Sequence, residues 1–440
     1  MEQRIDTVII GSGICGLSLA HFLSKQSKEF VVLEASNKVG GIIQTENKSG
    51  FICENGPNTV LLNNDAIIEL VKNCGLWESL NLPSEISNKN RYVLHKNELA
   101  LIPVSFKKFI SSPLLSFTSK FRLLFEPFIP KHKENTTVYD FIVKRFGKDF
   151  HDQLIEPFIT GIYAGDTKLM SAKHSLKILW NLEQSYGSVL IGLIKQKRKS
   201  KQIGSFNLPM GLSQLIHKIA EPIKDRIHLN TQVEKVVKNE FGYEVSSNSG
   251  RIFCKKVICA VPAYALHDLF IDEQLKSVLQ KVKYTPVDVF HFGFKKENIE
   301  NKAPGFGVLT KPSDNKSYLG ILFSSRTFDH VAPKGSELFT VLVGGMRQKE
   351  LCELPVEELE KRVLNELEQL IGHKGSLDFK KHYRWKRGIP QYDMNQEELN
   401  NVIVAFEAQN PDLFILGNFY AGISVSDCIL KAKNIANKID

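Results

Sequence analysis

A glycine-rich turn between two apolar runs is the feature of this sequence that most constrains its fold. Residues 8–10 are apolar, residues 17–22 continue as an apolar segment of helical character, and a second apolar run over residues 30–33 ends at Glu34. The turn between the first two segments holds three glycines at GxGxxG spacing: Gly11, Gly13 and Gly16. A strand, a glycine turn, a helix and a second strand that ends on an acidic residue predict a βαβ unit that binds a dinucleotide.

Each glycine has a separate task in such a unit. Gly11 allows the tight turn, Gly13 lets backbone N–H groups approach a pyrophosphate, and Gly16 lets the helix pack closely against the strand. The phosphates are expected at the helix N-terminus, where unpaired N–H groups and the helix dipole favour anions. Glu34 is expected to accept hydrogen bonds from the ribose hydroxyls.

A second pair of glycines narrows the choice of ligand. Gly40 and Gly41 follow Glu34 and precede Thr45. The simplest nicotinamide-binding folds run from the acidic residue into another helix without such a pair. A glycine pair here lets the backbone pass close to the second half of a bound dinucleotide, a pattern that resembles the large flavoprotein oxidase superfamily. FAD is therefore favoured over NAD, with a plain loop that contains two turn glycines as the alternative.

Composition bounds the remaining choices. At 440 residues and a formal charge of +9, the chain is expected to form two or three domains and to meet an anionic surface or acidic ligands. No apolar run reaches about 18 residues, and the N-terminal run is already used as a strand, so neither a transmembrane helix nor a signal peptide is expected. The seven cysteines lack CxxC spacing and are interpreted as free thiols in a reducing compartment. The histidines form no ligand cluster, so no metal site is expected.

The chain is expected to interleave its domains. Nucleotide-binding pieces are predicted over residues 1–79, 204–270 and 385–440. Residues 80–203 are basic, rich in phenylalanine and leucine, and predicted to be a helical insert. Residues 271–384 are predicted to form a substrate-binding domain.

Three further segments carry candidate sites. In the last piece, a glycine-flanked loop follows an apolar run and leads into a helix, whose N-terminus would stabilise an anionic reduced flavin ring. Val233 lies in a predicted strand that could pair its backbone with an adenine edge, although a core valine is equally consistent. Arg91 stands before two short strands and could clamp a carboxylate, although a solvated arginine is an equal alternative.

An aromatic stripe marks the helical insert. Apolar residues recur there at helical spacing, at Phe117, Phe121, Leu124, Phe125 and Phe128. Such a stripe is commonly core, but it also fits a helix face that lies in a membrane interface. The basic run Lys195–Lys201 follows the apolar VLIGLI, and each cation near an anionic leaflet contributes about 1 kcal/mol. Nucleic-acid binding is not expected, because no reading module accompanies this run.

Taken together, these pieces resemble the oxygen-dependent, FAD-containing protoporphyrinogen oxidase family, which also includes coproporphyrinogen oxidases. The resemblance spans the chain and rests on VIIGSGICGLSLA with Glu34, GGIIQT, ENGPNT, NRYVLHKNELALIP, EPFITGIYAGDTKLMS, FNLPMGL, GFGVLTKP, LVGGM, WKRGIPQY and GNFYAGISVSDCI. IYAGD, GFGVL and IPQY separate this group from amine oxidases. Cys15 departs from the family pattern, because the family often has a smaller or aliphatic residue there.

The resemblance implies an α/β fold: a Rossmann-like FAD-binding domain interleaved with an α+β substrate domain and a helical membrane-binding insert. It implies FAD held by Gly11, Ser12, Gly13, Ile14, Cys15, Gly16, Glu34, Ala35, Gly40, Gly41, Gly56, Pro57, Asn58, Thr59, Val233, Trp385, Gly417, Ile423, Ser424 and Val425. It implies a substrate cleft bounded by Asn58, Arg91, Gly165, Gly307 and Leu309. No catalytic side chain is expected, since flavin N5 is the reactive centre. FAD is expected to be non-covalent, because the loop from Gly417 to Gly422 has no cysteine and Cys428 lies about a turn into the helix.

The implied reaction belongs to haem and porphyrin biosynthesis. It is the conversion of protoporphyrinogen IX to protoporphyrin IX by three successive two-electron oxidations with O₂ as acceptor; the alternative is coproporphyrinogen III to coproporphyrin III. Other readings are a flavin oxidase for amines or polyenes, a non-catalytic tetrapyrrole-binding flavoprotein, and a nicotinamide-dependent reductase. The expected partners are a porphyrinogen, O₂ and an anionic membrane surface, with a homodimer left open. The expected location is cytoplasmic, at the inner face of the membrane.

Overall fold

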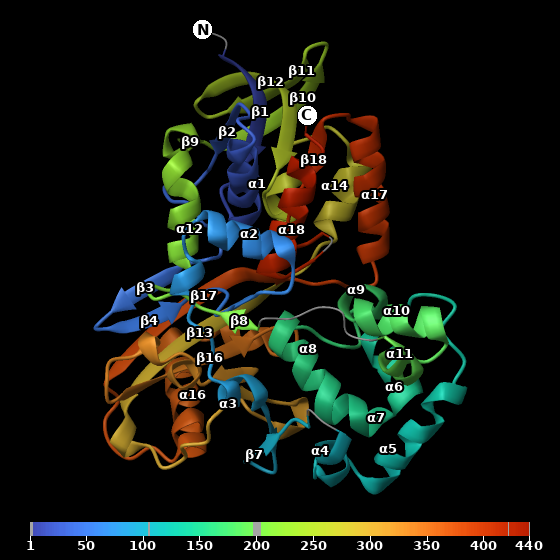
Figure 1. Cartoon of the computed structure of the whole chain (residues 1–440), viewed down its shortest axis with the longest axis vertical. Coiled ribbons are helices and arrows are strands. Elements are labelled where there is room, and N and C mark those ends of the chain that lie inside the picture. The colour runs from blue at the N-terminus through green and yellow to red at the C-terminus, as the bar shows by residue number, and fades with distance from the viewer. Residues whose placement is uncertain (1–2, 104–105, 197–203, 421, 440) are drawn as a thin grey trace.

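Two seven-stranded β-sheets, two small two-stranded sheets and a helical region make up the described part of the molecule (Figure 1). The computed structural model describes residues 3–103, 106–196, 204–420 and 422–439. The first sheet, with helices on both sides, lies at the top of the view, and the second sheet and the helical region lie below it. Among the described residues, no helix has the length and apolar character needed to cross a membrane.

The predicted βαβ unit is present. Its parts are β1 (Gln3–Ile10), α1 (Ile14–Lys25) and β2 (Phe30–Leu33), and the two strands pair in parallel. Side chains of β1 alternate between two separate cores: Ile9 belongs to one, and Val8 and Ile10 belong to the other. Alternating burial on both faces is what a parallel strand covered by helices on each side requires.

The first sheet gathers strands from distant parts of the chain. Its order is β10–β11–β12–β1–β2–β9, and β18 also pairs with β12. The additional strands are β9 (Ile227–His228), β10 (Val233–Asn239), β11 (Gly242–Ser247), β12 (Gly250–Cys259) and β18 (Leu413–Ile415). Tight turns separate β10, β11 and β12.

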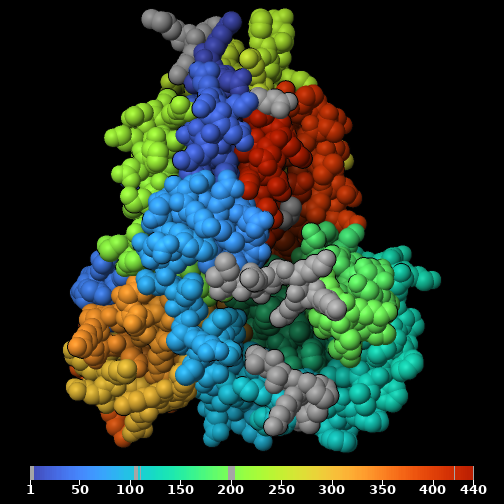
Figure 2. All heavy atoms as spheres, in the orientation of Figure 1, coloured from blue at the N-terminus to red at the C-terminus, as the bar shows by residue number. Residues whose placement is uncertain are grey.

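Helices cover both faces of this sheet. One core contains α1 with α2 (Asp65–Asn73), α12 (Ser213–Ala220) and α18 (Val425–Ala436). The other contains α13 (Ala263–Leu266), α14 (Glu273–Gln280) and α17 (Gln396–Gln409). Figure 2 shows the blue N-terminal segment and the red C-terminal segment forming one continuous surface, as the packing of α18 on α1 and α2 requires.

The second sheet is antiparallel except between β6 and β14. Its order is β17–β13–β16–β15–β14–β6–β7. The strands are β6 (Tyr92–His95), β7 (Glu98–Leu101), β13 (Tyr284–Lys295), β14 (Gly307–Leu309), β15 (Gly320–Leu322), β16 (Ser336–Gly344) and β17 (Phe379–Pro390). Helix α16 (Val356–Ile371) buries one residue per turn against it: Leu359, Val363, Leu367 and Ile371.

The helical region is built from short helices around one core. They are α4 (Phe106–Ser111), α5 (Phe117–Arg122), the 3₁₀ segment η2 (Leu123–Phe128), α6 (Val138–Phe146), α7 (Lys148–Phe150), the π-helical segment η3 (His151–Ile155), α8 (Glu156–Tyr163), α9 (Ala172–Ser175), α10 (Lys177–Tyr186) and α11 (Val189–Lys195). Smaller elements elsewhere are β3 (Thr45–Lys48), β4 (Phe51–Glu54), β5 (Val60–Leu61), β8 (Ser205–Phe206), α3 (Glu85–Lys89) and α15 (Ser324–Thr327).

The interleaved arrangement is present, but three groups of elements lie across the predicted limits. Helix α14 lies within residues 271–384, yet it packs into the core of the first sheet. Strand β17 begins before residue 385 and stays paired with β13 as far as Pro390, so the second sheet extends beyond the predicted boundary. Residues 80–203 also begin with β6 and β7, which belong to the second sheet. These domain boundaries depend on strand pairing and helix packing between residues far apart in sequence, which the local composition does not indicate.

Candidate active site

The carboxyl ends of the parallel strands meet at one edge of the first sheet. Ile10 lies opposite both Leu33 and Cys259, so β1, β2 and β12 end at the same level. Backbone hydrogen bonds continue the pairing beyond the strands: Gly11 N donates to Leu33 O over 2.8 Å, and Ala260 N donates to Ile10 O over 2.7 Å. A cleft of about 770 Å³ opens along this edge, within the size range of cofactor sites.

Two of the three turn glycines allow close backbone packing, and the third leaves open space in the cleft. Gly11 has a φ of +102°, and a Cβ on it would lie 2.7 Å from the carbonyl oxygen of Ala260. A Cβ on Gly16 would lie 2.0 Å from the oxygen of Gly11. A Cβ on Gly13 would meet no atom within 4 Å, so this residue faces open space in the cleft. Gly13 is also the N-cap of α1 and supplies no side-chain cap, which leaves first-turn N–H groups for an anion.

The second glycine pair closes over the first turn. Gly40 N donates to the carbonyl oxygen of Ser12 over 2.9 Å, and a Cβ on Gly41 would lie 3.3 Å from Gly13 Cα. Neither Gly40 nor Gly41 lines the cleft. They pack against the backbone of residues 12–13, and a side chain on Gly41 would push the two backbone segments apart.

Glu34 is held in place by hydrogen bonds from two serines. Its Oε2 accepts from Ser12 N and Oγ over 2.8 and 2.7 Å, and its Oε1 accepts from Ser36 N and Oγ over 2.9 and 2.8 Å. Burial raises the pKa of this carboxyl, but the four donors outweigh it and the pKa lies below its ordinary value. Because a carboxylate offers about four acceptor positions, a ribose hydroxyl that binds here must replace a serine hydroxyl.

Eleven of the predicted cofactor residues line the cleft: Gly11, Gly13, Ile14, Cys15, Glu34, Ala35, Pro57, Val233, Gly417, Ile423 and Val425. Those that do not are Ser12, Gly16, Gly40, Gly41, Gly56, Asn58, Thr59, Trp385 and Ser424. Val233 also belongs to the core of the first sheet, and the pairing of its backbone with an adenine edge stays a prediction.

One wall of the cleft was not predicted. It comes from the segment after β12 and from the residues before β10, and it contains Thr231, Gln232, Val261, Pro262, Tyr264, Asp268 and Leu269. Strand β12 runs parallel beside β1, so it must also end at the cleft edge. That pairing was the missing signal, since ligands of such sheets bind outside the carboxyl ends of the strands.

The loop before α18 is fixed by a tyrosine from another segment. Tyr392 OH donates to Asn418 O over 2.8 Å and accepts from Gly422 N over 2.9 Å, so one hydroxyl spans the loop. Tyr392 is buried in the core of the helical region, which links that region to the cleft. Ser424 and Asp427 form a capping box at the start of α18, so part of this helix N-terminus is satisfied by its own chain.

Three of the predicted substrate residues lie on or next to two neighbouring strands of the second sheet. Gly307 and Leu309 lie on β14, which pairs in parallel with β6, and Arg91 directly precedes β6. Arg91 is an exposed residue whose guanidinium carbon lies 4.8 Å from the centre of the Phe306 ring, and partial burial lowers the pKa of the guanidinium. Leu309 contacts α8, because a Cβ on Gly161 would lie 2.6 Å from Leu309 Cδ2.

Asn58 and Phe306 line a second, smaller hollow. Glu54 lies at its base, where burial raises the pKa of the carboxyl to about 7 although Thr45, Asn207 and Leu212 donate to it. The structure therefore brings Asn58 and the Arg91–Phe306 pair to one place.

Gly165 lies at the end of α8, enclosed by Met170 and Gln391. Its neighbour Ala164 shares a small core with Trp385. The Trp385 indole donates to Asn55 O over 2.6 Å, so it supports the loop that carries Asn58 and does not line the large cleft.

The aromatic stripe is on the surface, so its interpretation as core is wrong. Phe117 and Phe128 are 81% and 82% exposed, and Phe121, Leu124 and Phe125 are also exposed. Exposed apolar residues continue on α11, where Ile194 is 83% exposed. We refer to Phe117, Phe121, Leu124, Phe125, Phe128, Leu193 and Ile194 as the apolar face. In the basic run that follows, Lys195 and Gln196 are described, and Lys197 to Lys201 lie outside the described residues.

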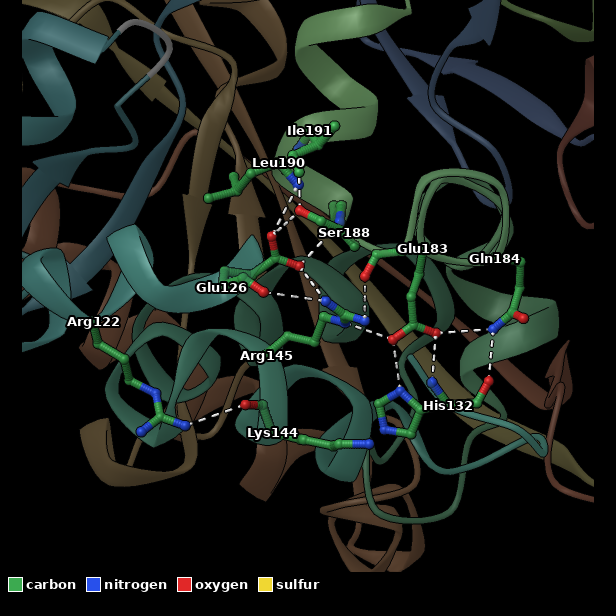
Figure 3. Close-up of polar contacts among 12 residues, drawn as sticks. Arg122, Glu126, His132, Lys144, Arg145, Glu183, Gln184, Ser188, Leu190 and Ile191 are labelled. Atoms are coloured by element: carbon green, nitrogen blue, oxygen red, sulfur yellow. Dashed lines mark hydrogen bonds and ion pairs between the residues drawn. The ribbon is translucent and has the colours of Figure 1, made fainter. Parts of the chain in front are cut away.

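A buried charge network explains why the stripe faces outward (Figure 3). Glu126 lies inside the stripe in sequence, yet it is fully buried. Its carboxylate accepts from Arg145 Nη1 over 2.6 Å, from Val189 N over 3.0 Å and from Ser188 Oγ. Because Glu126 must point inward to meet these donors, the aromatic residues on the other side of η2 point to solvent.

The same arginine connects the network to a second carboxylate. Arg145 is fully buried, and its Nε donates to Glu183 Oε1 over 2.5 Å. His132 Nδ1 lies 2.8 Å from that same oxygen (Figure 3). Since removal of one partner from a buried pair leaves an uncompensated charge, this network holds η2, α6, α10 and α11 in one arrangement.

Comparison with known proteins gives consistent matches along the chain. A family model for flavin-containing amine oxidoreductases matches residues 14–440. A mitochondrial protoporphyrinogen oxidase of Nicotiana tabacum is 30% identical, over 98% of this chain and 94% of its own length. A coproporphyrinogen III oxidase of Bacillus subtilis (strain 168) is 26% identical, over 98% and 97%. A crystal structure from Exiguobacterium sp. 255-15, provisionally named a protoporphyrinogen oxidase, shares the fold with a TM-score of 0.83 at 23% identity, covering 100% of this chain and 99% of its own.

The Tyr392 contact gives a test of the cleft. Tyr392→Phe removes both hydrogen bonds to the loop and leaves Gly422 N without a partner, at a cost of about 1–3 kcal/mol. We expect the dissociation constant of FAD to rise about tenfold in a flavin-binding titration of the apoprotein. Tyr163→Phe is the control, since the Tyr163 hydroxyl donates to Ser175 O over 3.4 Å within the helical region. Equal FAD affinity in both variants would show that the loop does not depend on Tyr392.

Proposed function

This chain belongs to the family of flavin-containing amine oxidoreductases and uses FAD, and from that premise we propose that it oxidises a porphyrinogen. The substrate we favour is protoporphyrinogen IX, converted to protoporphyrin IX in three successive two-electron steps with O₂ as the final acceptor. Arg91 is the observation that supports this most. Its guanidinium lies on the Phe306 ring beside the hollow that Asn58 lines, an arrangement that suits a largely apolar substrate that carries carboxylates.

The residues that line the large cleft fit FAD. The space in front of Gly13, the first-turn N–H groups of α1 and the ionised Glu34 would hold the pyrophosphate and ribose. Bound FAD supplies an acceptor for a hydride and electrons. The protein's own task is then to place the macrocycle and to fix its carboxylates. No strong side-chain base is needed for this reaction, because pyrrole N–H protons can leave to solvent.

Coproporphyrinogen III is the second candidate substrate. A relative named a protoporphyrinogen oxidase and one named a coproporphyrinogen III oxidase both match nearly the full length of this chain, at 30% and 26% identity. Coproporphyrinogen has four carboxylates where protoporphyrinogen has two. The net charge of +9 favours the binding of either carboxylate-bearing substrate, so the assay below compares the two directly.

We further propose that the apolar face binds an anionic membrane surface, at the inner face of the cytoplasmic membrane. Its aromatic side chains would enter the interface, while Lys195 and the basic residues that follow it in sequence would meet lipid phosphates. The product is apolar and phototoxic, so an exit toward a membrane has a physical purpose. The non-covalent state of FAD and self-association into a homodimer stay predictions.

A porphyrin fluorescence assay under air, with both porphyrinogens side by side, tests the proposed activity. Arg91→Ala should raise KM about tenfold and change kcat little, because a remote carboxylate contact acts equally on ground and transition states. Arg4→Ala is the matched control, since Arg4 also lies over an exposed ring, that of Phe241, on the first sheet. No porphyrin from either substrate would refute the proposed activity, and an unchanged KM would remove Arg91 from the site.

Vesicle sedimentation tests the apolar face. We expect the holoprotein to bind vesicles that contain anionic phospholipid, and to bind less as salt rises, because exposed charges are screened over about 8–10 Å. The triple variant Phe121→Ser, Phe125→Ser, Phe128→Ser should keep its flavin and lose binding. The control Phe241→Ser, Ile271→Ser removes equally exposed apolar groups at the first sheet and should still bind. Equal binding by the two variants would contradict a membrane role for this face.

A further inference from the structure

Glu54 is a buried carboxylate whose hydrogen bonds reach two other segments of the chain. It is the last residue of β4, directly before the loop over residues 55–59, and it is 4% exposed. Its Oε1 accepts from Leu212 N over 2.7 Å and from Asn207 Nδ2 over 3.2 Å. Its Oε2 accepts from Thr45 Oγ1 over 2.7 Å. These three donors replace the water that burial removes from the carboxylate.

Asn207 connects this carboxylate to the loop. Its side-chain Nδ2 donates both to Glu54 Oε1 and to the backbone oxygen of Asn58, over 3.2 and 2.9 Å. An amide nitrogen carries two hydrogens, so both are used. The amide oxygen accepts from Leu208 N over 2.6 Å, and the residue is buried. Because every polar group of this side chain is engaged, a change at Glu54 is passed on to Asn58.

The two ends of the loop have anchors of their own. At the first end, Trp385 Nε1 donates to Asn55 O over 2.6 Å. At the other end, Val60 on β5 pairs with Phe206 on β8. Between these anchors, the hydrogen bond from Asn207 fixes the middle of the loop.

We propose that Glu54 is a positioning residue for the substrate: through Asn207, its carboxylate fixes the place of Asn58 at the small hollow. Glu54 and Asn58 both line this hollow, together with Phe306, on whose ring Arg91 lies. The proposal rests on the proposed function, because it takes the hollow as part of the porphyrinogen site. Glu54 acts through Asn207 and needs no contact with the substrate.

The charge of Glu54 sets the strength of this connection. A hydrogen bond to an ionised acceptor is about twice as strong as one between neutral groups. When Glu54 takes up a proton, the proton belongs on Oε2, because Oε1 already faces two N–H donors. There it is donated to Thr45 Oγ1, which also accepts from Ser213 N over 2.9 Å. The network keeps its connections, but the bond from Asn207 becomes a neutral one and weakens.

Both charge states of Glu54 are populated near neutral pH, because burial raises its pKa to about 7. The titratable groups packed around it are Glu46 on β3, Cys53 on β4, His291 on β13, His330 after α15 and Lys381 on β17. Burial lowers the pKa of His291 to about 3 and raises that of Cys53 to about 12, so neither changes its charge in this range. Burial also holds the pKa of His330 below its ordinary value, so His330 titrates below Glu54.

The pH dependence of KM tests the role of Glu54. Its carboxyl is ionised above pH 7, where the bond from Asn207 is strong, and protonated below, where that bond is weak. We expect KM of the wild-type holoprotein to rise about fivefold from about pH 8 to about pH 6, with a smaller change in kcat, because a displaced Asn58 acts mainly on binding. Glu54→Gln has the shape of the protonated acid, so its KM should stay at the low-pH value throughout.

Asn207→Ala tests whether Asn207 carries the effect. This variant keeps the charge of Glu54 but removes the bond to Asn58, so its KM should be high at every pH. The double variant with Glu54→Gln should have the KM of Asn207→Ala alone, because the two residues act in series. Glu366→Gln is the matched control: on α16, Glu366 accepts from Ser317 N and Oγ over 2.9 and 2.8 Å. Its KM profile should follow the wild type.

Hydrogen exchange of residues 55–61 provides a readout that needs no turnover. At about pH 8 in the holoprotein, exchange there should be faster in Glu54→Gln and in Asn207→Ala than in the wild type, and unchanged in Glu366→Gln. Equal exchange in Glu54→Gln and the wild type, an unchanged wild-type KM between about pH 6 and about pH 8, or multiplied effects in the double variant would overturn the proposal. Faster exchange without porphyrin formation by any protein would support the connection from Glu54 to Asn58 and refute only the proposed activity.

Discussion

The close approach of two backbone segments at the edge of the first sheet is the constraint on which the rest of the structure depends. A Cβ on Gly11 or Gly16 would enter the van der Waals radius of a carbonyl oxygen, so only glycine allows α1 to start directly above β1 beside the end of β12. This approach brings β1, β2, β12 and β18 to one level and points the N-terminus of α1 into the cleft. The backbone of the glycine turn therefore provides most of the cofactor site, and the carboxylate of Glu34 adds one side-chain acceptor.

A second constraint arranges the helical region around this site. The buried Arg145 meets two carboxylates, and Glu126 reaches it from within the aromatic stripe. The cost of leaving any of these charges unpaired fixes the orientation of η2, and so decides which side chains are exposed. Tyr392 then connects the core of this region to the loop beside the cleft. The apolar face, the strands next to Arg91 and the large cleft are thus parts of one packed unit.

Much of the nucleotide-binding part could be predicted, because its signals are local. The glycine spacing, the apolar runs on either side of it and the acidic residue that ends the second run all lie within residues 8–34. The wall that contains Val261, the Tyr392 contact and the burial of Glu126 depend on partners far away in sequence. From the local sequence alone, a glutamate within an aromatic stripe would be predicted to face solvent, yet Glu126 is buried. The boundary errors at α14 and β17 have the same cause, since pairing and packing across long separations decide them.

An anaerobic titration of the holoprotein with protoporphyrinogen and with coproporphyrinogen tests most directly whether the FAD cleft and the hollow beside Arg91 form one active site. The visible absorbance band of the flavin and the fluorescence of the porphyrin are followed together. We expect one of the porphyrinogens to abolish the flavin band at about a third of a molar equivalent, because each macrocycle gives up three electron pairs, and porphyrin to appear in step. A flavin band that neither porphyrinogen changes, but that a simple amine abolishes, would contradict a porphyrinogen site.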